Sequence, residues 1–495
     1  MRFLLLVLSL PLSLSLSFPQ DVPHRTTTTD KAIDAIARNI TRAGGRISVC
    51  WLLDASPSMA DDRAVVAKKI DSIFADLPKS ATISMTVVGF DDKPKKYGDL
   101  TDVRDDVRAA IGKIGAKGSG KENVCAAIDA AARLLHGEGQ TRAIILITDE
   151  SGDDAEKLEA TINRVKEEGV QVHIVGREAR FGWTQSYEHD GRWWVPVLAG
   201  PESAAQEVMH RNPICCYQEE YPRCLKRLVD SGAKTEEFQA DDPLGCDLGP
   251  GYVVTAGYGP CALERLAKES GGSFTIMGGK PTYDPKAMEG YEPELITVEL
   301  WKERNGKSPM RRALLTMFEE RVKARDMGLR ATFGKGECEG LAGKAKKAEA
   351  QVDQWIAALV KARKDAGEPT ADKTGKIYKR WYANVDLAIA QLRALAHAIE
   401  QYRMLMEEIA SGKRAVGPNP LYLVKAAPRE AKRRAAAIEE CIFIDKTHPG
   451  TPWAWTARWI ASRLGGFDVV EAKPPIGNRP NPGPTPPAPP PPKEK

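Results

Sequence analysis

Apolar residues between positions 46 and 176 occur in short, mostly unbroken runs that amphipathic stretches separate. The runs ISVCWLLD, ATISMTVVGF, RAIILITD and VQVHIVG predict buried strands. The stretches between them, such as RAVVAKKIDSIFADL and DAEKLEATINRVKEEG, repeat apolar residues at helical spacing. Strands that are apolar on both faces and alternate with helices predict an α/β fold with a doubly wound, mainly parallel sheet.

This alternation stops after residue 176 and resumes near residue 260. Residues 178–258 are rich in aromatic residues, Cys, Gly and Pro, and PCALERLAKESGGSFTIM then restores a helix and a strand. The pattern indicates one domain, 46–280, that carries a Cys-rich insertion of about 178–258. Because structureless loops of this length are uncommon in compact domains, we expect the insertion to have some order of its own.

Beyond residue 280 we expect no further strands and a helical region at 300–466. Its most regular part, 340–412, predicts a coiled coil, because apolar residues recur there at a and d positions of a heptad. A second copy of the chain is one partner for this stripe, which would give helix-mediated self-association. A helix within the same chain is the other, and we favour such a hairpin. The stripe consists of Val385, Ala388, Leu392, Leu395, Ile399, Tyr402, Met406 and Ile409, and the facing stripe of Val352, Trp355, Ile356 and Leu359.

The two ends of the chain differ from the rest. Residues 1–17 have one early Arg and then an apolar run with small residues at its end, which predicts a cleaved signal peptide rather than an uncleaved anchor. No later segment is long and apolar enough for a membrane span, so we expect none in the mature chain. The Pro-rich residues 470–495 predict an extended, disordered tail. Export would place the protein in a periplasm, a cell envelope or the medium.

Composition narrows the function further. The net charge of +4 in 495 residues gives no reason to expect a nucleic-acid partner. Five of the nine cysteines fall between Cys215 and Cys261, and export permits disulfides among them. Zinc is a rival for this cluster, with His210 nearby, but no C-x-x-C pair is present.

The segment GAKGSGKEN, 115–123, comes close to a phosphate-binding P-loop. A working P-loop follows a strand and has Ser or Thr after its Lys to hold magnesium. Here Glu122 follows Lys121, and the preceding segment VRDDVRAAIGKI predicts a helix. A nucleotide hydrolase using Lys121 and Asp149 is therefore an unfavoured alternative, and with no other catalytic motif we expect no enzyme and assign no catalytic residue.

The first predicted strand ends in LLDASPSMADD, which places Asp54, Ser56 and Ser58 in a D-x-S-x-S pattern. Open α/β sheets bind ligands at the carboxyl ends of their strands. A carboxylate and two hydroxyls on one turn suit a hard divalent cation, which prefers oxygen ligands. These side chains could instead form an Asx-turn and a helix cap.

This segment resembles the von Willebrand factor type A (vWA) domain, a Rossmann-like fold with a metal-ion-dependent adhesion site. That site combines D-x-S-x-S with a Thr from a second loop and an Asp after a later strand. DASPSM matches the first element and Asp149 in LITDES matches the last, and the resemblance covers roughly 46–176 and 260–278.

The sequence departs from the family at the second loop, where Glu122 stands at the position of the Thr. The resemblance implies a metal site made of Asp54, Ser56, Ser58, Glu122 and Asp149, with Ser119, Asp61 and Asp153 as supporting groups behind the ligands. The extra carboxylate of Glu122 could hold the ion more tightly. Alternatively, Lys121 or an arginine could pair with Glu122 and leave the site degraded.

The resemblance implies an exported, adhesion-type binding module. Its cofactor would be a divalent cation, Mg²⁺ ahead of Mn²⁺ or Ca²⁺, and its partner a protein or cell-surface ligand that offers a carboxylate. A structural scaffold that binds through its C-terminal helices is the main alternative.

Overall fold

The structure is a computed structural model that describes most of the chain between residues 29 and 471. The predicted signal peptide 1–17 and residues 472–495 of the predicted tail lie outside the described residues. No described helix is long and apolar enough to cross a membrane. The described ranges are 29–41, 44–75, 79, 81–115, 122–149, 152–179, 187–189, 192–194, 256–277, 283–324, 327, 329–330, 332–370, 377–429 and 432–471.

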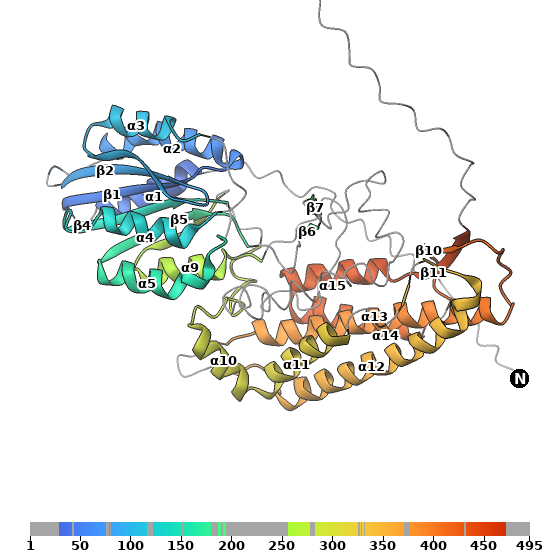
Figure 1. The fold of residues 1–495 in the computed structure, drawn as a ribbon. Coiled ribbons are helices and arrows are strands. Elements are labelled where there is room, and N and C mark those ends of the chain that lie inside the picture. The colour runs from blue at the N-terminus through green and yellow to red at the C-terminus, as the bar shows by residue number, and fades with distance from the viewer. Residues whose placement is uncertain are drawn as a thin grey trace, which may run out of the picture.

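A six-stranded sheet has the order β3-β2-β1-β4-β5-β8. It belongs to the first part of the molecule, which Figure 1 draws in blue to green. The β1–β2, β1–β4, β4–β5 and β5–β8 pairs are parallel, and β2–β3 is antiparallel. The predicted α/β fold with a mainly parallel sheet is therefore confirmed. The strands are β1 (Gly45–Asp54), β2 (Ala81–Phe90), β3 (Lys95–Thr101), β4 (Thr141–Ile147), β5 (Val170–Gly176) and β8 (Ser273–Ile276).

Helices cover both faces of this sheet. One face packs against α1, α2 and α3, and the other against α4, α5 and α9. The packed domain begins earlier in the sequence than residue 46, because α1 buries Ile33, Ile36 and Ile40 in the first of these cores. The helices are α1 (Thr29–Thr41), α2 (Ala60–Ala75), α3 (Arg104–Gly112), α4 (Val124–Leu134), α5 (Leu158–Glu167) and α9 (Cys261–Glu269), with 3-10 turns at Pro57–Met59 and Ala155–Lys157.

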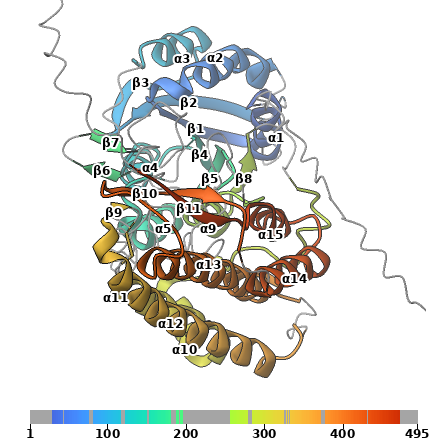
Figure 2. The ribbon, with the colours of Figure 1, turned by 90° about the vertical axis from the view of Figure 1, so that its right-hand side faces the viewer.

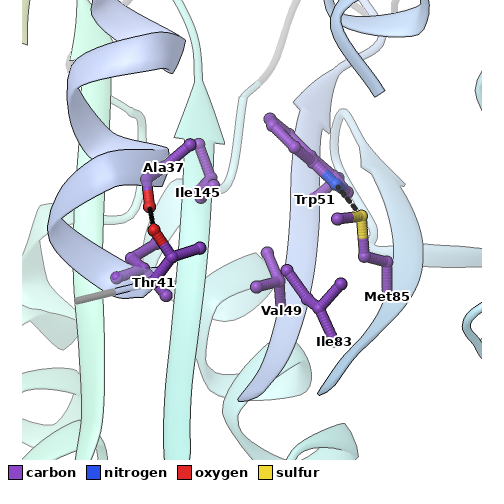
Figure 3. Close-up of a pocket in the computed structure, with 8 residues that line it drawn as sticks. Ala37, Thr41, Val49, Trp51, Ile83, Met85 and Ile145 are labelled. Carbon is purple, nitrogen blue, oxygen red and sulfur yellow. Dashed lines mark hydrogen bonds between the residues drawn. The ribbon is translucent and has the colours of Figure 1, made fainter. Parts of the chain in front are cut away.

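A small cavity lies between α1 and the sheet (Figure 3). The polar groups beside it are already used: Trp51 Nε1 donates to Met85 Sδ at 3.2 Å, and Thr41 Oγ1 donates to the carbonyl of Ala37 at 2.8 Å. With an otherwise apolar lining and no polar group left to orient a ligand, this cavity is a packing feature. It is lined by Ala37, Ile40, Thr41, Val49, Trp51, Ile83, Met85 and Ile145.

The predicted insertion leaves the sheet domain after β5 and returns before α9. Its base is closed by two backbone hydrogen bonds, from Ala179 N to Tyr258 O at 2.7 Å and from Ala256 N to Ala179 O at 2.8 Å. Within it, β6 (Tyr187–His189) and β7 (Arg192–Trp194) form an antiparallel hairpin. The insertion's cysteines Cys215, Cys216, Cys224 and Cys246 lie outside the described residues.

The second part of the molecule is mainly helical; it lies beside the sheet domain in Figure 1 and partly in front of it in Figure 2. Its longest helices, α12 and α13, pack against each other, and the predicted heptad stripe of α13 is buried there within one chain. The seam is thus an intramolecular hairpin. The helices are α10 (Val298–Lys307), α11 (Pro309–Ala324), α12 (Cys338–Asp365), α13 (Arg380–Ala410), α14 (Lys432–Thr447) and α15 (Pro452–Arg463), with a 3-10 turn at Lys335–Glu337.

The expectation that no strand follows residue 280 is wrong. A three-stranded antiparallel sheet in the order β11-β10-β9 lies in the helical region. It consists of β9 (Thr332–Phe333), β10 (Leu421–Ala426) and β11 (Gly466–Glu471). These strands are short and far apart in the sequence, so no local period reveals them, whereas packing of Leu421, Leu423 and Phe467 on the helical core stabilises them.

Candidate metal-binding site

Two predicted site residues lie at the same edge of the sheet. Asp54 is the last residue of β1, and Asp149 follows β4 by two positions. Because β1 and β4 are parallel neighbours, with Leu53 opposite Ile147, their carboxyl ends bring both carboxylates to one edge. The topology therefore brings together two groups that are far apart in the sequence.

The carboxylate of Asp54 is completely buried and is held by two hydrogen bonds. Its Oδ1 accepts from the backbone N–H of Ser56 at 2.8 Å, and its Oδ2 accepts from Thr148 Oγ1 at 2.9 Å. Burial raises the pKa of Asp54, and the charge of Asp149 raises it further, while these hydrogen bonds lower it. Two carboxylates close together in a dry site favour binding of a cation.

The two serines of the motif present their hydroxyls side by side. Ser56 Oγ and Ser58 Oγ lie 2.9 Å apart, with Ser56 buried and Ser58 exposed. The buried guanidinium of Arg63 holds this loop from below, donating from Nη1 to the carbonyls of Asp54 at 2.6 Å and Ser56 at 2.9 Å. Burial lowers the pKa of Arg63, although the negative charges of Asp54 and Asp62 raise it.

The carboxylate of Asp149 has one oxygen in an ion pair and one without a partner. Its Oδ2 lies 3.3 Å from Nη2 of Arg177, and its Oδ1 is buried without a hydrogen bond. Buried polar atoms rarely lack a partner, and in native proteins such an atom calls for an explanation, for which an ion is one candidate. Sequence reasoning missed Arg177, although its place directly after β5 at the same sheet edge was a usable signal.

Glu122 is buried and its backbone is tied to the loop that follows β4. Its N–H donates to Asp153 Oδ2 at 3.1 Å, and its carbonyl accepts from Asp153 N at 2.7 Å and from Val124 N at 3.1 Å. Asp153 thus joins the loop before α4 to the loop after β4. Ser119 and Lys121 lie outside the described residues.

The other acidic residues at this edge have separate roles. Asp154 is buried and accepts from the N–H groups of Cys125 and Ala126, both at 2.9 Å, at the start of α4. Asp62 accepts from Thr29 Oγ1 at 2.6 Å, while Asp61 is exposed on the first turn of α2. Asp61 therefore has no contact within the described part of the chain that ties it to the site, whereas Asp153 is hydrogen-bonded to Glu122.

The donor set fits a hard divalent cation. Asp54 and Asp149 supply charge, Ser56 and Ser58 supply neutral hydroxyl oxygens, and Asp149 Oδ1 has no other hydrogen-bonding partner. The described residues hold no group of three His, Cys, Asp or Glu side chains able to bind a metal. The structure therefore does not bring the Glu122 carboxylate together with those of Asp54 and Asp149, and the serine hydroxyls are essential to any site here.

Comparison with known families agrees with this arrangement. Residues 49–152 match the family model of the von Willebrand factor type A domain. This part of the chain is a vWA domain. The match spans β1 to the loop after β4, and so includes every predicted ligand position. The structure also argues against a P-loop, because helix α3 precedes Gly115, where a P-loop has a strand.

The chain is also similar to solved structures of low identity. BatB from Bacteroides thetaiotaomicron is 14% identical, with 47% of this chain and 91% of that chain covered and a TM-score of 0.28. An aerotolerance-related membrane protein from Bacteroides fragilis is 17% identical, with 46% and 90% covered and a TM-score of 0.26. Proximal thread matrix protein 1 from the mussel byssus, with a zinc-occupied MIDAS motif, is 22% identical, with 28% and 37% covered and a TM-score of 0.24. No curated protein matches the chain.

Proposed function

We propose that this protein is an exported binding protein whose vWA domain captures an acidic ligand through a divalent cation. The cation, which we take to be Mg²⁺, is held by Asp54, Ser56, Ser58 and Asp149. Glu122 of the second loop is a further ligand that has to turn its carboxylate toward the ion, because the structure does not group it with Asp54 and Asp149. When bound, the ion supplies positive charge and an open coordination position for the carboxylate of a protein or cell-surface ligand. No chemical reaction is part of this proposal.

One observation carries the proposal: Asp149 Oδ1 is buried without a hydrogen bond, close enough to the completely buried Asp54 for its charge to raise the pKa of that carboxyl. The protein's own groups prepare this arrangement. Thr148 and the Ser56 N–H hold the carboxylate of Asp54, and Arg63 fixes the serine loop. Preorganised oxygen donors reduce the cost of ordering ligands when an ion binds.

The scaffold alternative has less support from the structure. The heptad stripe of α13, on which helix-mediated self-association would rest, is buried against α12 in the same chain. Binding through the C-terminal helices would therefore need another face.

The test is calorimetric titration of Mg²⁺, Mn²⁺ and Ca²⁺ into the chain and into two variants. Asp54→Ala removes a ligand, and Asp99→Ala removes a carboxylate that is 93% exposed on β3, away from the sheet edge that carries the site. We expect ion binding by the parent chain and by Asp99→Ala, and none by Asp54→Ala. Absence of binding by the parent chain, or equal binding by all three, would count against the proposed site.

A further inference from the structure

We propose that Arg177 is a built-in counter-ion of the metal site, which holds Asp149 in the ion-free protein and sets the ion affinity by opposing the cation. This inference rests on the proposed function, because it concerns the same site. It concerns a residue outside the set that the sequence pattern predicts as ligands.

The contact itself is specific. Nη2 of Arg177 lies 3.3 Å from Oδ2 of Asp149, so the guanidinium neutralises one of the two carboxylates at this edge. The side chain of Asp149 is 11% exposed and that of Arg177 is 50% exposed. The acid is thus fixed in the site, whereas the base reaches it from the solvent side.

Charge determines the direction of the effect. Asp54 and Asp149 carry negative charges that attract a divalent cation, and Arg177 cancels one of them whether or not Glu122 contributes a further one. A cation at the unpartnered Oδ1 would share one carboxylate with the guanidinium that is paired with Oδ2, and like charges so close together repel. Solvent screens the half-exposed Arg177 in part, so we expect it to weaken ion binding roughly tenfold rather than abolish it.

Arg177 can release Asp149 when the ion binds without a rearrangement of the backbone. Two residues beyond Arg177, Ala179 is paired with Tyr258 and Ala256 through the backbone bonds at the base of the insertion. Tyr258 in turn donates its hydroxyl to the carbonyl of Met288 at 2.6 Å. Since the main chain is anchored here, release of Asp149 requires only rotation of a half-exposed arginine side chain.

The opposite role makes the opposite prediction. If Arg177 instead orients Asp149 for the ion, its removal weakens ion binding. The experiment therefore compares the parent chain with Arg177→Gln and Arg177→Lys by titration with Mn²⁺ and Mg²⁺. Arg108→Gln is the matched control, because Arg108 is 41% exposed, is paired with Asp105 and Asp71, and lies on α3.

We expect Arg177→Gln to bind the ion roughly tenfold tighter, Arg177→Lys to remain near the parent value, and Arg108→Gln to be unchanged. Thermal unfolding gives a second readout. Without ion, Arg177→Gln should melt below the parent chain, because Asp149 loses its counter-ion, and saturating ion should remove that deficit.

Equal or weaker ion binding by Arg177→Gln overturns the inference and leaves the metal site standing. A complete lack of ion binding by the parent chain and by Arg177→Gln removes the proposed function and the inference together. Tighter binding by Arg177→Gln with an unchanged Arg108→Gln supports it.

Discussion

Thr148 Oγ1 donates a hydrogen bond of 2.9 Å to Oδ2 of Asp54, so the residue after β4 holds the carboxylate that ends β1. This bond crosses between two strands and fixes a charge that has no exposure to solvent. A buried carboxylate lowers the stability of the ion-free protein, and loss of stability for the sake of function is frequent at binding sites.

Asp54→Asn should therefore stabilise the ion-free protein while it abolishes ion binding. Burial raises the pKa of Asp54 above its ordinary 3.8, so the ionised carboxylate destabilises the fold above that range. We expect a gain of about 1 kcal/mol at pH 7. The gain should shrink as the pH falls through the raised pKa of Asp54 and vanish below 3.8, where the carboxyl is protonated in both the folded and the unfolded state. Chemical denaturation of both chains at several pH values measures this, and a variant less stable than the parent at pH 7 contradicts it.

Asp154→Ala should destabilise the sheet domain without requiring an ion. Asp154 is buried and accepts from the first N–H groups of α4, those of Cys125 and Ala126. Removing such a cap costs about 1–2 kcal/mol, and the N–H groups left buried add to this. Asp61→Ala, at an exposed position on α2, is the control and should change stability little. Equal unfolding free energies for the two variants would show that Asp154 has no capping role.

His173 should make stability depend on pH between about 4 and 6.5. It is buried in β5, with Nδ1 2.9 Å from Ser273 Oγ, and burial lowers its pKa from 6.5 to about 4. Within this range the unfolded chain binds a proton that the folded protein does not. Stability therefore falls as the pH drops from 6.5 to 4, by roughly 3 kcal/mol at most. His173→Gln should flatten this part of the curve, and parallel curves for the two chains would contradict the prediction.

Four buried or nearly buried side chains join the segment after β8 to the helical region. Tyr291 Oη lies 2.8 Å from Nδ1 of His448, whose Nε2 lies 3.1 Å from Oδ2 of Asp386, and Arg363 Nε donates to Oδ1 of that residue at 2.8 Å. Asp386→Ala should cost about 3–5 kcal/mol, because the charge of Arg363 and a ring nitrogen of His448 lose their partner. Tyr291→Phe should cost about 1 kcal/mol. Urea unfolding of the helical region measures both losses of stability. A larger loss in Tyr291→Phe than in Asp386→Ala would show that the charge of Asp386 does not dominate this network.

The sequence predicted the parts of the fold whose signal is local. Long apolar runs identified β1, β2, β4 and β5, because strands buried on both faces need apolar residues at nearly every position. The polar edge strand β3, KKYGDLT, has no such pattern and is half exposed, so its pairing with β2 was not predicted. The strands of the second sheet were missed because their partners are distant in the sequence.

The residues of the candidate site also separate into those with a local sequence signal and those without one. Asp54, Ser56 and Ser58 belong to one short motif and were predicted, and Asp149 was recognised because LITDES matches the later aspartate of the vWA adhesion site. Arg63, Thr148 and Arg177 were not, although they hold or neutralise those residues. Their roles depend on which strand ends are neighbours, and only the sheet order β3-β2-β1-β4-β5-β8 determines that.

Glu122→Thr is the substitution that tests the departure from the family at the second loop. The backbone of Glu122 is held by Asp153 and Val124 through bonds that any residue can make, so the substitution leaves these bonds in place. If the buried carboxylate is an ion ligand, a hydroxyl in its place removes a negative charge and should weaken ion binding about tenfold or more.

Calorimetric titration of Glu122→Thr beside Glu138→Thr, a control on the loop between α4 and β4, measures this effect. Unchanged affinity would show that Glu122 is not a ligand. Tighter binding would show that its carboxylate opposes the site, for which pairing with a neighbouring cation is the explanation that the sequence left open. Weaker binding in Glu122→Thr alone would show that the carboxylate of Glu122 is an ion ligand. Such a site holds its cation more firmly and leaves less positive charge for the partner's carboxylate.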